Sequence, residues 1–117
     1  MNIGLGHALR GLVFLMRSQR NARVHGVITA LVLALGLGLQ ITRLEWAFIA
    51  LATAAVWAAE AFNTAVERLA DRVTTERDPL IKQAKDVAAG AVLIACAGAV
   101  AVGLLVLGPP LWARMGG

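Results

Sequence analysis

The sequence predicts an all-α integral membrane protein with three transmembrane helices and an amphipathic helix on the membrane surface. The 117 residues are 59% hydrophobic and only 15% charged, with a mean hydropathy of +0.74, whereas soluble domains carry about 25% charged residues. A chain this short cannot bury so much apolar surface within itself. The excess is expected to face lipid or other subunits, and the length allows one domain, residues 1–117, with a few spans of about 20 residues each.

The N-terminal segment, residues 5–20, is predicted to form the surface helix. Its apolar residues recur at roughly helical spacing among arginines, which is typical of a helix lying in the membrane interface; they are Leu9, Leu12, Val13, Leu15 and Met16. The N-terminus, Met1 to Gly11, is not expected to be a cleaved signal peptide, because it has no cleavage site after a small-residue pair and because arginines follow it rather than precede an apolar core.

Three longer apolar runs are predicted to span the membrane, at residues 24–40, 46–73 and 87–107. The second run keeps its helical pattern past the membrane edge, so its C-terminal part is expected to project into water. Asp78-Pro79 lies in the break before the third run and disfavours helix immediately before the proline. Gly108-Pro109-Pro110 is expected to end the third span.

The distribution of Lys and Arg predicts the orientation of the spans. Four of these residues precede the first span, one lies in the first loop, five lie around the second loop and one lies in the tail. By the positive-inside rule, the N-terminus and the second loop are cytoplasmic and the C-terminus is outside. The net charge of +4 therefore reflects topology, and no nucleic-acid partner is expected.

Four polar residues of the second span are predicted to share one helix face, which we call the acidic face: Glu60, Asn63, Glu67 and Asp71. Their spacing of three or four residues follows the helical turn. Glu60 and Asn63 come directly after an apolar run, where an ionisable side chain is costly and a functional role is the default interpretation. A bound cation would relieve repulsion between the carboxylates, and Mg²⁺ held together with substrate phosphates suits their oxygens. For Asp71, an ordinary solvated helix end is the alternative.

Lys85 and Asp86 are predicted to open the third span at the same cytoplasmic level. A lysine beside magnesium-binding carboxylates suits phosphate binding. The alternatives are a plain topology charge for Lys85 and a helix-capping role for Asp86. The sequence contains no Walker P-loop and no kinase glycine-rich loop, so metal and side chains would hold any nucleotide. Cys96 is the single cysteine, which excludes a disulfide framework and a cysteine-based metal site.

The strings from Glu60 to Asp71 and from Ala84 to Leu93, EAFNTAVERLAD and AKDVAAGAVL, closely resemble the prokaryotic diacylglycerol kinase family. This family of small membrane kinases includes diacylglycerol kinases and undecaprenol kinases, and the resemblance extends over about residues 8–106. It implies a homotrimeric helical bundle in the bacterial inner membrane. It also implies transfer of the γ-phosphate of ATP, with Mg²⁺, to the hydroxyl of undecaprenol or diacylglycerol at the cytoplasmic interface.

The resemblance implies a role for each residue of the acidic face. Glu60 looks like the general base on the lipid hydroxyl, and Glu67 looks like the Mg²⁺ ligand beside the nucleotide. Asn63 and Asp71 look like residues that organise the catalytic site or face the nucleotide. The other nucleotide contacts that the resemblance implies are Glu76, Arg77, Asp78, Lys85 and Asp86.

The turn before the first span differs from the family pattern. Gln19 stands where the family usually has a second metal-binding glutamate, and a neutral amide is a poorer Mg²⁺ ligand, so binding of a second metal is left open. The stretch that contains Asn21, Arg23 and His25 resembles the undecaprenol kinase branch. Arg23 and His25 are expected either to line the lipid entry or to anchor the span at the headgroups. His7 is either a neighbour of the nucleotide or a plain interfacial histidine.

Two other classes of function are compatible with the residues. Three spans and an intramembrane glutamate allow a small transporter or channel subunit with a proton-coupled Glu60. Four N-terminal arginines allow a non-catalytic adaptor that binds anionic lipid. The kinase is preferred because the acidic face lies at the cytoplasmic edge of the membrane, and because the adaptor leaves Glu60 and Asn63 unexplained.

Overall fold

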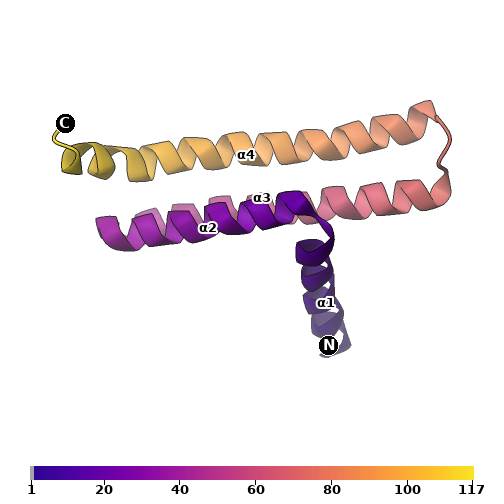
Figure 1. The fold of residues 1–117 in the computed structure, drawn as a ribbon, viewed down its shortest axis with the longest axis horizontal. Helices are drawn as coiled ribbons and strands as arrows, with labels where there is room; N and C mark the ends of the chain where they lie inside the picture. Colours follow the sequence, from indigo (N-terminus) through magenta and orange to yellow (C-terminus); the bar gives the residue numbers. More distant parts are fainter. Residues whose placement is uncertain (1) are drawn as a thin grey trace.

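Four helices account for almost all of residues 2–117, the part of the chain that the computed structural model describes, with side-chain exposure described from residue 4 onward. They are α1 Asn2–Ser18, α2 Arg20–Leu39, α3 Arg43–Val73 and α4 Pro79–Arg114. No strand occurs among the described residues, so the predicted all-α fold is confirmed. α2, α3 and α4 are each long and apolar enough to cross a membrane. In Figure 1 these three run alongside one another, with α4 beside α3.

Helix α1 leaves the bundle at a steep angle to the other three helices (Figure 1). This is the arrangement expected of a helix that lies on the membrane surface while its neighbours cross the bilayer. α1 contacts α3 through the Arg68 guanidinium, which lies 4.9 Å from the centre of the Phe14 ring. It begins at Asn2 and ends at Ser18, slightly earlier at both ends than predicted. Its end is earlier because Gln19 takes an extended backbone conformation (φ −117°, ψ 120°) as the N-cap residue of α2.

Helix α3 begins with a capping box that the sequence encodes in four residues. The Thr42 hydroxyl accepts a hydrogen bond from the Glu45 backbone N–H at 3.2 Å, and the Glu45 carboxylate accepts one from the Thr42 N–H at 2.9 Å. The helix then runs without a break for 31 residues, which is about 46 Å at 1.5 Å per residue. A hydrocarbon core is about 30 Å thick, so α3 is long enough to extend into water as the sequence predicted. Its C-terminal end lies well beyond the start of α2 in Figure 1.

Helix α4 is longer than predicted at both ends. Asp78 caps its start, accepting hydrogen bonds from the N–H groups of Leu80 and Ile81, and Pro79 occupies the first helical position, where a missing N–H costs nothing. The prediction that Gly108-Pro109-Pro110 ends the helix is wrong, since α4 continues to Arg114. The fixed φ of proline is itself helical, so the prolines cost hydrogen bonds without forcing the chain out of the helix.

Little of the chain is buried, and the apolar core lies where α2, α3 and α4 meet away from the α3–α4 loop. Its centre is Ile49, Val106 and Leu107. α2 approaches α3 closely at Gly36, where an added Cβ would lie 2.6 Å from Cη2 of Trp46. Most large apolar side chains are exposed, as the composition required for a chain surrounded by lipid or by other subunits.

The close approach at Gly36 predicts opposite effects for two alanine substitutions in α2. Gly36→Ala is expected to destabilise the purified protein by about 1 to 3 kcal/mol, because the methyl group overpacks against Trp46. Gly38→Ala is the matched control, since its added Cβ would meet nothing within 4 Å. Alanine favours helix by about 0.8 to 1 kcal/mol over glycine, so this control should unfold at an unchanged or higher temperature. Equal thermal midpoints for the two variants would contradict the packing.

Candidate active site

The acidic face passes from a buried to an exposed environment along the unbroken helix α3. Glu60 is only 5% exposed and the neighbouring Thr64 is 6% exposed. Asn63 is partly buried, whereas Glu67 and Asp71 are exposed. One rigid element therefore carries a buried carboxylate at one level and two solvated carboxylates roughly two and three turns further on. The arrangement offers separate apolar and aqueous binding environments along a single helix.

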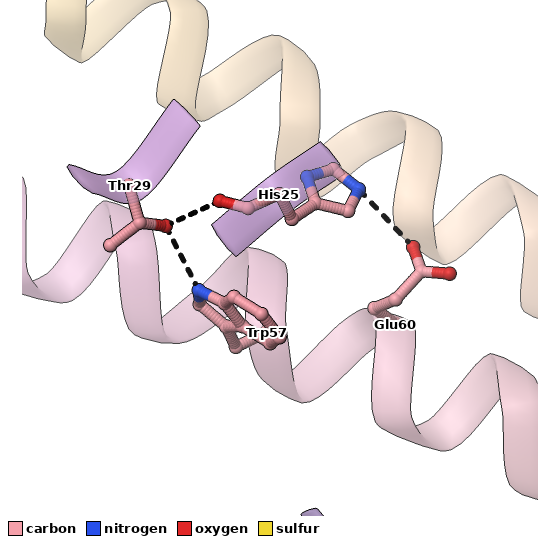
Figure 2. A network of polar contacts seen from close by, with 4 residues as sticks. All are labelled: His25, Thr29, Trp57 and Glu60. Carbon is pink, nitrogen blue, oxygen red and sulfur yellow. Dashed lines mark hydrogen bonds and ion pairs between the residues drawn. The ribbon is translucent and has the colours of Figure 1, made fainter. Parts of the chain in front are cut away.

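Glu60 contacts α2 through a small polar network (Figure 2). The His25 imidazole Nε2 lies 3.4 Å from Glu60 Oε2. The Trp57 indole N–H donates to the Thr29 hydroxyl at 3.1 Å, and that hydroxyl donates to the His25 carbonyl at 2.8 Å. The structure thus brings together Glu60 and His25, which sequence analysis had placed on the lipid side. It adds Thr29 and Trp57, which the sequence analysis missed.

Asn63 carries a buried acceptor that has no hydrogen-bond partner within the described residues, its side-chain Oδ1. Leaving a buried polar atom unpaired costs about 1 to 3 kcal/mol. An unpaired buried acceptor one turn after Glu60 is typical of a site in which a ligand or a second chain supplies the missing donor. This geometry suits a residue that organises a catalytic site.

Lys85 and Asp86 do not act as a pair in the structure. Lys85 Nζ lies 2.6 Å from Asp71 Oδ1, and this hydrogen bond raises the pKa of the lysine. Asp86 instead binds Lys82, one helical turn earlier, also at 2.6 Å. The capping alternative for Asp86 is wrong, because Asp78 caps α4 and Asp86 lies inside the helix. Neighbouring residues on a helix point about 100° apart, which separates the two side chains.

A hollow at the α3–α4 loop gathers most of the residues that the resemblance assigns to the nucleotide. It has a volume of about 470 Å³ and is lined by Glu76, Arg77, Asp78, Pro79, Ile81, Lys82 and Lys85. Lys85 links this hollow to Asp71 on the acidic face. Asp86 and Glu67 are not part of the lining, although Glu67 is close enough to raise the pKa of Lys85 by its charge. Lysine and arginine at such a hollow can bind phosphate oxygens.

The residues present fit a magnesium ion held jointly by protein and nucleotide. Among residues 2–117, no cluster of three His, Cys, Asp or Glu side chains could hold a metal by itself. Mg²⁺ commonly takes only one or two carboxylates and completes its shell with water and substrate phosphates. Glu67 is exposed and makes no ion pair in the described part of the chain, so its carboxylate is available. Gln19 lies in the extended break between α1 and α2.

The residues predicted for the lipid side separate into two groups. His25 points to Glu60 and also lines a largely apolar cavity of about 410 Å³ between α2, α3 and α4. Arg23 turns away and donates to the Arg17 carbonyl at the end of α1 at 3.1 Å, and Asn21 is exposed.

Thr29 and Trp57 could have been found from their spacing, since Thr29 lies four residues after His25 and Trp57 lies three residues before Glu60. Only the packing of α2 on α3 shows that the pairs meet.

Comparison with known proteins identifies the family of this chain. A family model described as "Prokaryotic diacylglycerol kinase" matches residues 6–107. The chain belongs to this family. An undecaprenol kinase of Bacillus subtilis is 36% identical over 105 residues, which cover 90% of this chain and 85% of that protein. A diacylglycerol kinase of Synechocystis is 36% identical over 114 residues, 97% of this chain and 65% of that protein.

Membership of the family decides between the classes of function that the sequence allowed. The chain is a multi-pass membrane lipid kinase, and its activity uses ATP. The transporter or channel hypothesis, with a proton-coupled Glu60, is not supported by these relatives, and neither is the non-catalytic adaptor. The resemblance in the strings around Glu60 and Lys85 is therefore confirmed at the level of the family.

The exposure of the Asp71–Lys85 pair predicts a small contribution to stability. The two side chains are 61% and 36% exposed, and exposed ion pairs contribute about 0 to 1 kcal/mol. In a double-mutant cycle with Asp71→Asn and Lys85→Met, the coupling in the free energy of unfolding is expected to stay below about 1 kcal/mol. Unfolding in detergent, followed by circular dichroism, measures it. A coupling of several kcal/mol would show that the pair is desolvated in the assembled protein.

Proposed function

We propose that the protein catalyses transfer of the γ-phosphate of ATP to the hydroxyl of a membrane lipid, undecaprenol in preference to diacylglycerol, with Mg²⁺. The observation that carries this proposal is the position of Glu60, a carboxylate that is 5% exposed on the helix that also carries Asp71, the partner of Lys85. A buried carboxylate suits a base for an alcohol that stays in the membrane, and the exposed end suits a nucleotide that arrives from water.

Glu60 acts as the general base in this proposal. The lipid O–H bond breaks as its proton passes to the Glu60 carboxylate, and the lipid oxygen forms a bond to the γ-phosphorus. The bond between that phosphorus and the β–γ bridging oxygen breaks, and ADP leaves. Phosphoryl transfer depends mainly on positioning and on stabilising charge, so a short constellation of side chains suffices. Asn63, one turn from Glu60, organises the reacting groups through its unpaired amide.

The nucleotide is proposed to bind between the acidic face and the α3–α4 loop. Lys85 and the loop residues Glu76, Arg77 and Asp78 bind phosphates and ribose, with Asp71 holding the Lys85 ammonium in place. Asp86 lies further around α4, on the Lys82 side of the helix. Glu67 would hold Mg²⁺ together with the phosphates, and the bound ion would supply charge neutralisation at the γ-phosphate. Gln19 is the weaker candidate for a second metal.

The lipid is proposed to reach Glu60 from the α2 side. His25 already contacts the Glu60 carboxylate, which supports a place beside the lipid hydroxyl. Arg23 and Asn21 lie at the start of the same helix and suit contacts with headgroups. The preference for undecaprenol rests on the resemblance of the stretch from Asn21 to His25 to the undecaprenol kinase branch. The undecaprenol kinase relative also matches this chain over 85% of its own length.

The working form is proposed to be a homotrimer in the bacterial inner membrane. The N-terminus and the α3–α4 loop face the cytoplasm, where ATP is found, and the C-terminus lies outside; the distribution of Lys and Arg supports this orientation. The many exposed apolar side chains of the single chain leave ample surface for contacts between copies as well as for lipid.

The roles of the two glutamates predict selective loss of activity. Glu60→Gln is expected to lower ATP-dependent lipid phosphorylation by about 10²- to 10⁴-fold, the usual contribution of a general base, and Glu67→Gln should abolish it by weakening Mg²⁺ binding. Glu45→Gln is the matched control, since it makes the same change at the opposite end of α3 and glutamine still supports a capping box. Transfer of label from γ-labelled ATP into extracted lipid measures the rate. Full activity in both purified variants would overturn the proposal.

The lipid preference predicts the outcome of a competition assay. Purified protein in mixed micelles is offered undecaprenol and diacylglycerol at equal mole fractions together with labelled ATP. The expected result is a kcat/KM at least tenfold higher for undecaprenol, because even a factor of ten needs only about 1.4 kcal/mol of differential transition-state stabilisation. A higher kcat/KM for diacylglycerol would reverse the assignment of the lipid while leaving the reaction class intact.

A further inference from the structure

We propose that Thr29 and Trp57 are positioning residues, which hold His25 so that its imidazole fixes the orientation of the Glu60 carboxylate. The inference rests on the proposed role of Glu60 as the base and adds two residues to that site. It is drawn from the closed circuit of contacts in Figure 2, which begins and ends on α3. Trp57 and Glu60 lie one turn apart on α3, and His25 and Thr29 lie one turn apart on α2.

The Thr29 hydroxyl is the centre of this circuit because it uses both of its hydrogen-bonding capacities. As a donor it binds the His25 carbonyl at 2.8 Å, the contact with the preceding turn that threonine commonly makes inside helices. As an acceptor it receives the Trp57 indole N–H at 3.1 Å. The N–H is the only hydrogen-bonding group of the indole. In an apolar surrounding the donor has few other partners, so the bond fixes the two helices relative to each other.

The same four residues control how the imidazole faces the carboxylate. The His25 and Trp57 rings pack edge to face, with centroids 6.3 Å apart and planes at 63°. This ring packing, together with the hydrogen bond from Thr29 to the His25 carbonyl, leaves Nε2 directed at Glu60 Oε2, 3.4 Å away. With one carboxylate oxygen beside the imidazole, the other remains for the lipid hydroxyl, and the base no longer rotates freely. A base held in one orientation reacts faster than one that samples many.

Packing elsewhere on α2 does not replace this circuit. The buried residues of α2 are Ala22, before His25, and Gly36, beyond Thr29. Between them, at the level of His25 and Thr29, the large apolar side chains of Val27, Ile28 and Leu31 are exposed, and Val32, which packs against the apolar core, lies beyond Thr29. The rotation of α2 about its own axis at the level of Glu60 is therefore set by the polar contacts of His25 and Thr29 with α3. Removing the hydrogen bond between Thr29 and Trp57 frees the imidazole without removing any group proposed to contact substrate.

The test uses substitutions that remove one hydrogen-bonding group: Thr29→Val keeps the shape of the side chain, and Trp57→Phe keeps an aromatic ring. Thr29→Val and Trp57→Phe are each expected to lower kcat by roughly 10- to 100-fold, the usual effect of a small misplacement of a reacting group, with the KM for ATP unchanged. Thr29→Ser restores the hydroxyl and should recover most of the activity. Thr53→Val is the matched control, because Thr53 lines the same cavity as Thr29 and Trp57 and makes no side-chain hydrogen bond within the described residues; it should keep wild-type kcat.

A double-mutant cycle separates positioning through His25 from a merely structural role. In a His25→Gln background, Thr29→Val is expected to have no further effect on kcat, because the group that it positions is already gone. Independent, multiplying losses would overturn the inference, and so would wild-type kcat in both Thr29→Val and Trp57→Phe. These outcomes are distinct from failure of the proposed function, which full activity of Glu60→Gln would show. Thermal midpoints of all variants exclude loss of folded protein as the cause.

Discussion

The burial of Glu60 at the end of an apolar stretch is the constraint on which the rest of the structure depends. A carboxylate that is 5% exposed beside a bilayer loses most of its hydration, and only contacts with other polar groups offset that loss. The structure supplies one such group, the imidazole of His25 from α2. The need for a polar neighbour therefore determines how α2 is placed on α3, along with the close approach at Gly36.

The length of α3 explains how one small chain serves a lipid and a nucleotide together. From Glu60 to Asp71 the helix rises about 16 Å, which is enough to pass from an apolar to an aqueous environment. A phosphate chain that extends from the Lys85 side toward Glu60 would pass Glu67 and then Asn63, and these residues carry the free carboxylate and the unpaired amide. The order of residues along a single helix face thus follows the order of groups in the proposed reaction, with no separate nucleotide-binding domain.

The sequence predicted the features that depend on periodicity and on membrane thickness, and it failed where tertiary contacts or helix ends decide. The three spans, the surface helix and the acidic face follow from patterns along one helix. The adjacency of Lys85 and Asp86 predicted that they act as a pair, although the side chains of adjacent helical residues point in different directions and here bind different partners. The prolines after Gly108 predicted the end of the helix, although the fixed φ of proline is helical and α4 continues through them. Trp57 and Thr29 lie 28 residues apart in sequence, and their contact depends on the packing of α3 on α2, which no pattern within either helix contains.

The segment of α3 from Glu60 to Asp71 contacts each of the other three helices through a side chain of its own. Glu60 meets α2 through the imidazole, Arg68 meets the surface helix α1 through an aromatic ring, and Asp71 meets α4 through a lysine ammonium. Each of these contacts pairs a charged group with an imidazole, an aromatic face or an opposite charge, and none relies on the sparse apolar core, which lies further from the loop. In lipid, where apolar side chains gain little from meeting one another, a directional contact such as that of the buried Glu60 with His25 helps to determine how the helices fit together. The residues proposed to carry out the reaction are for this reason among those that assemble the site.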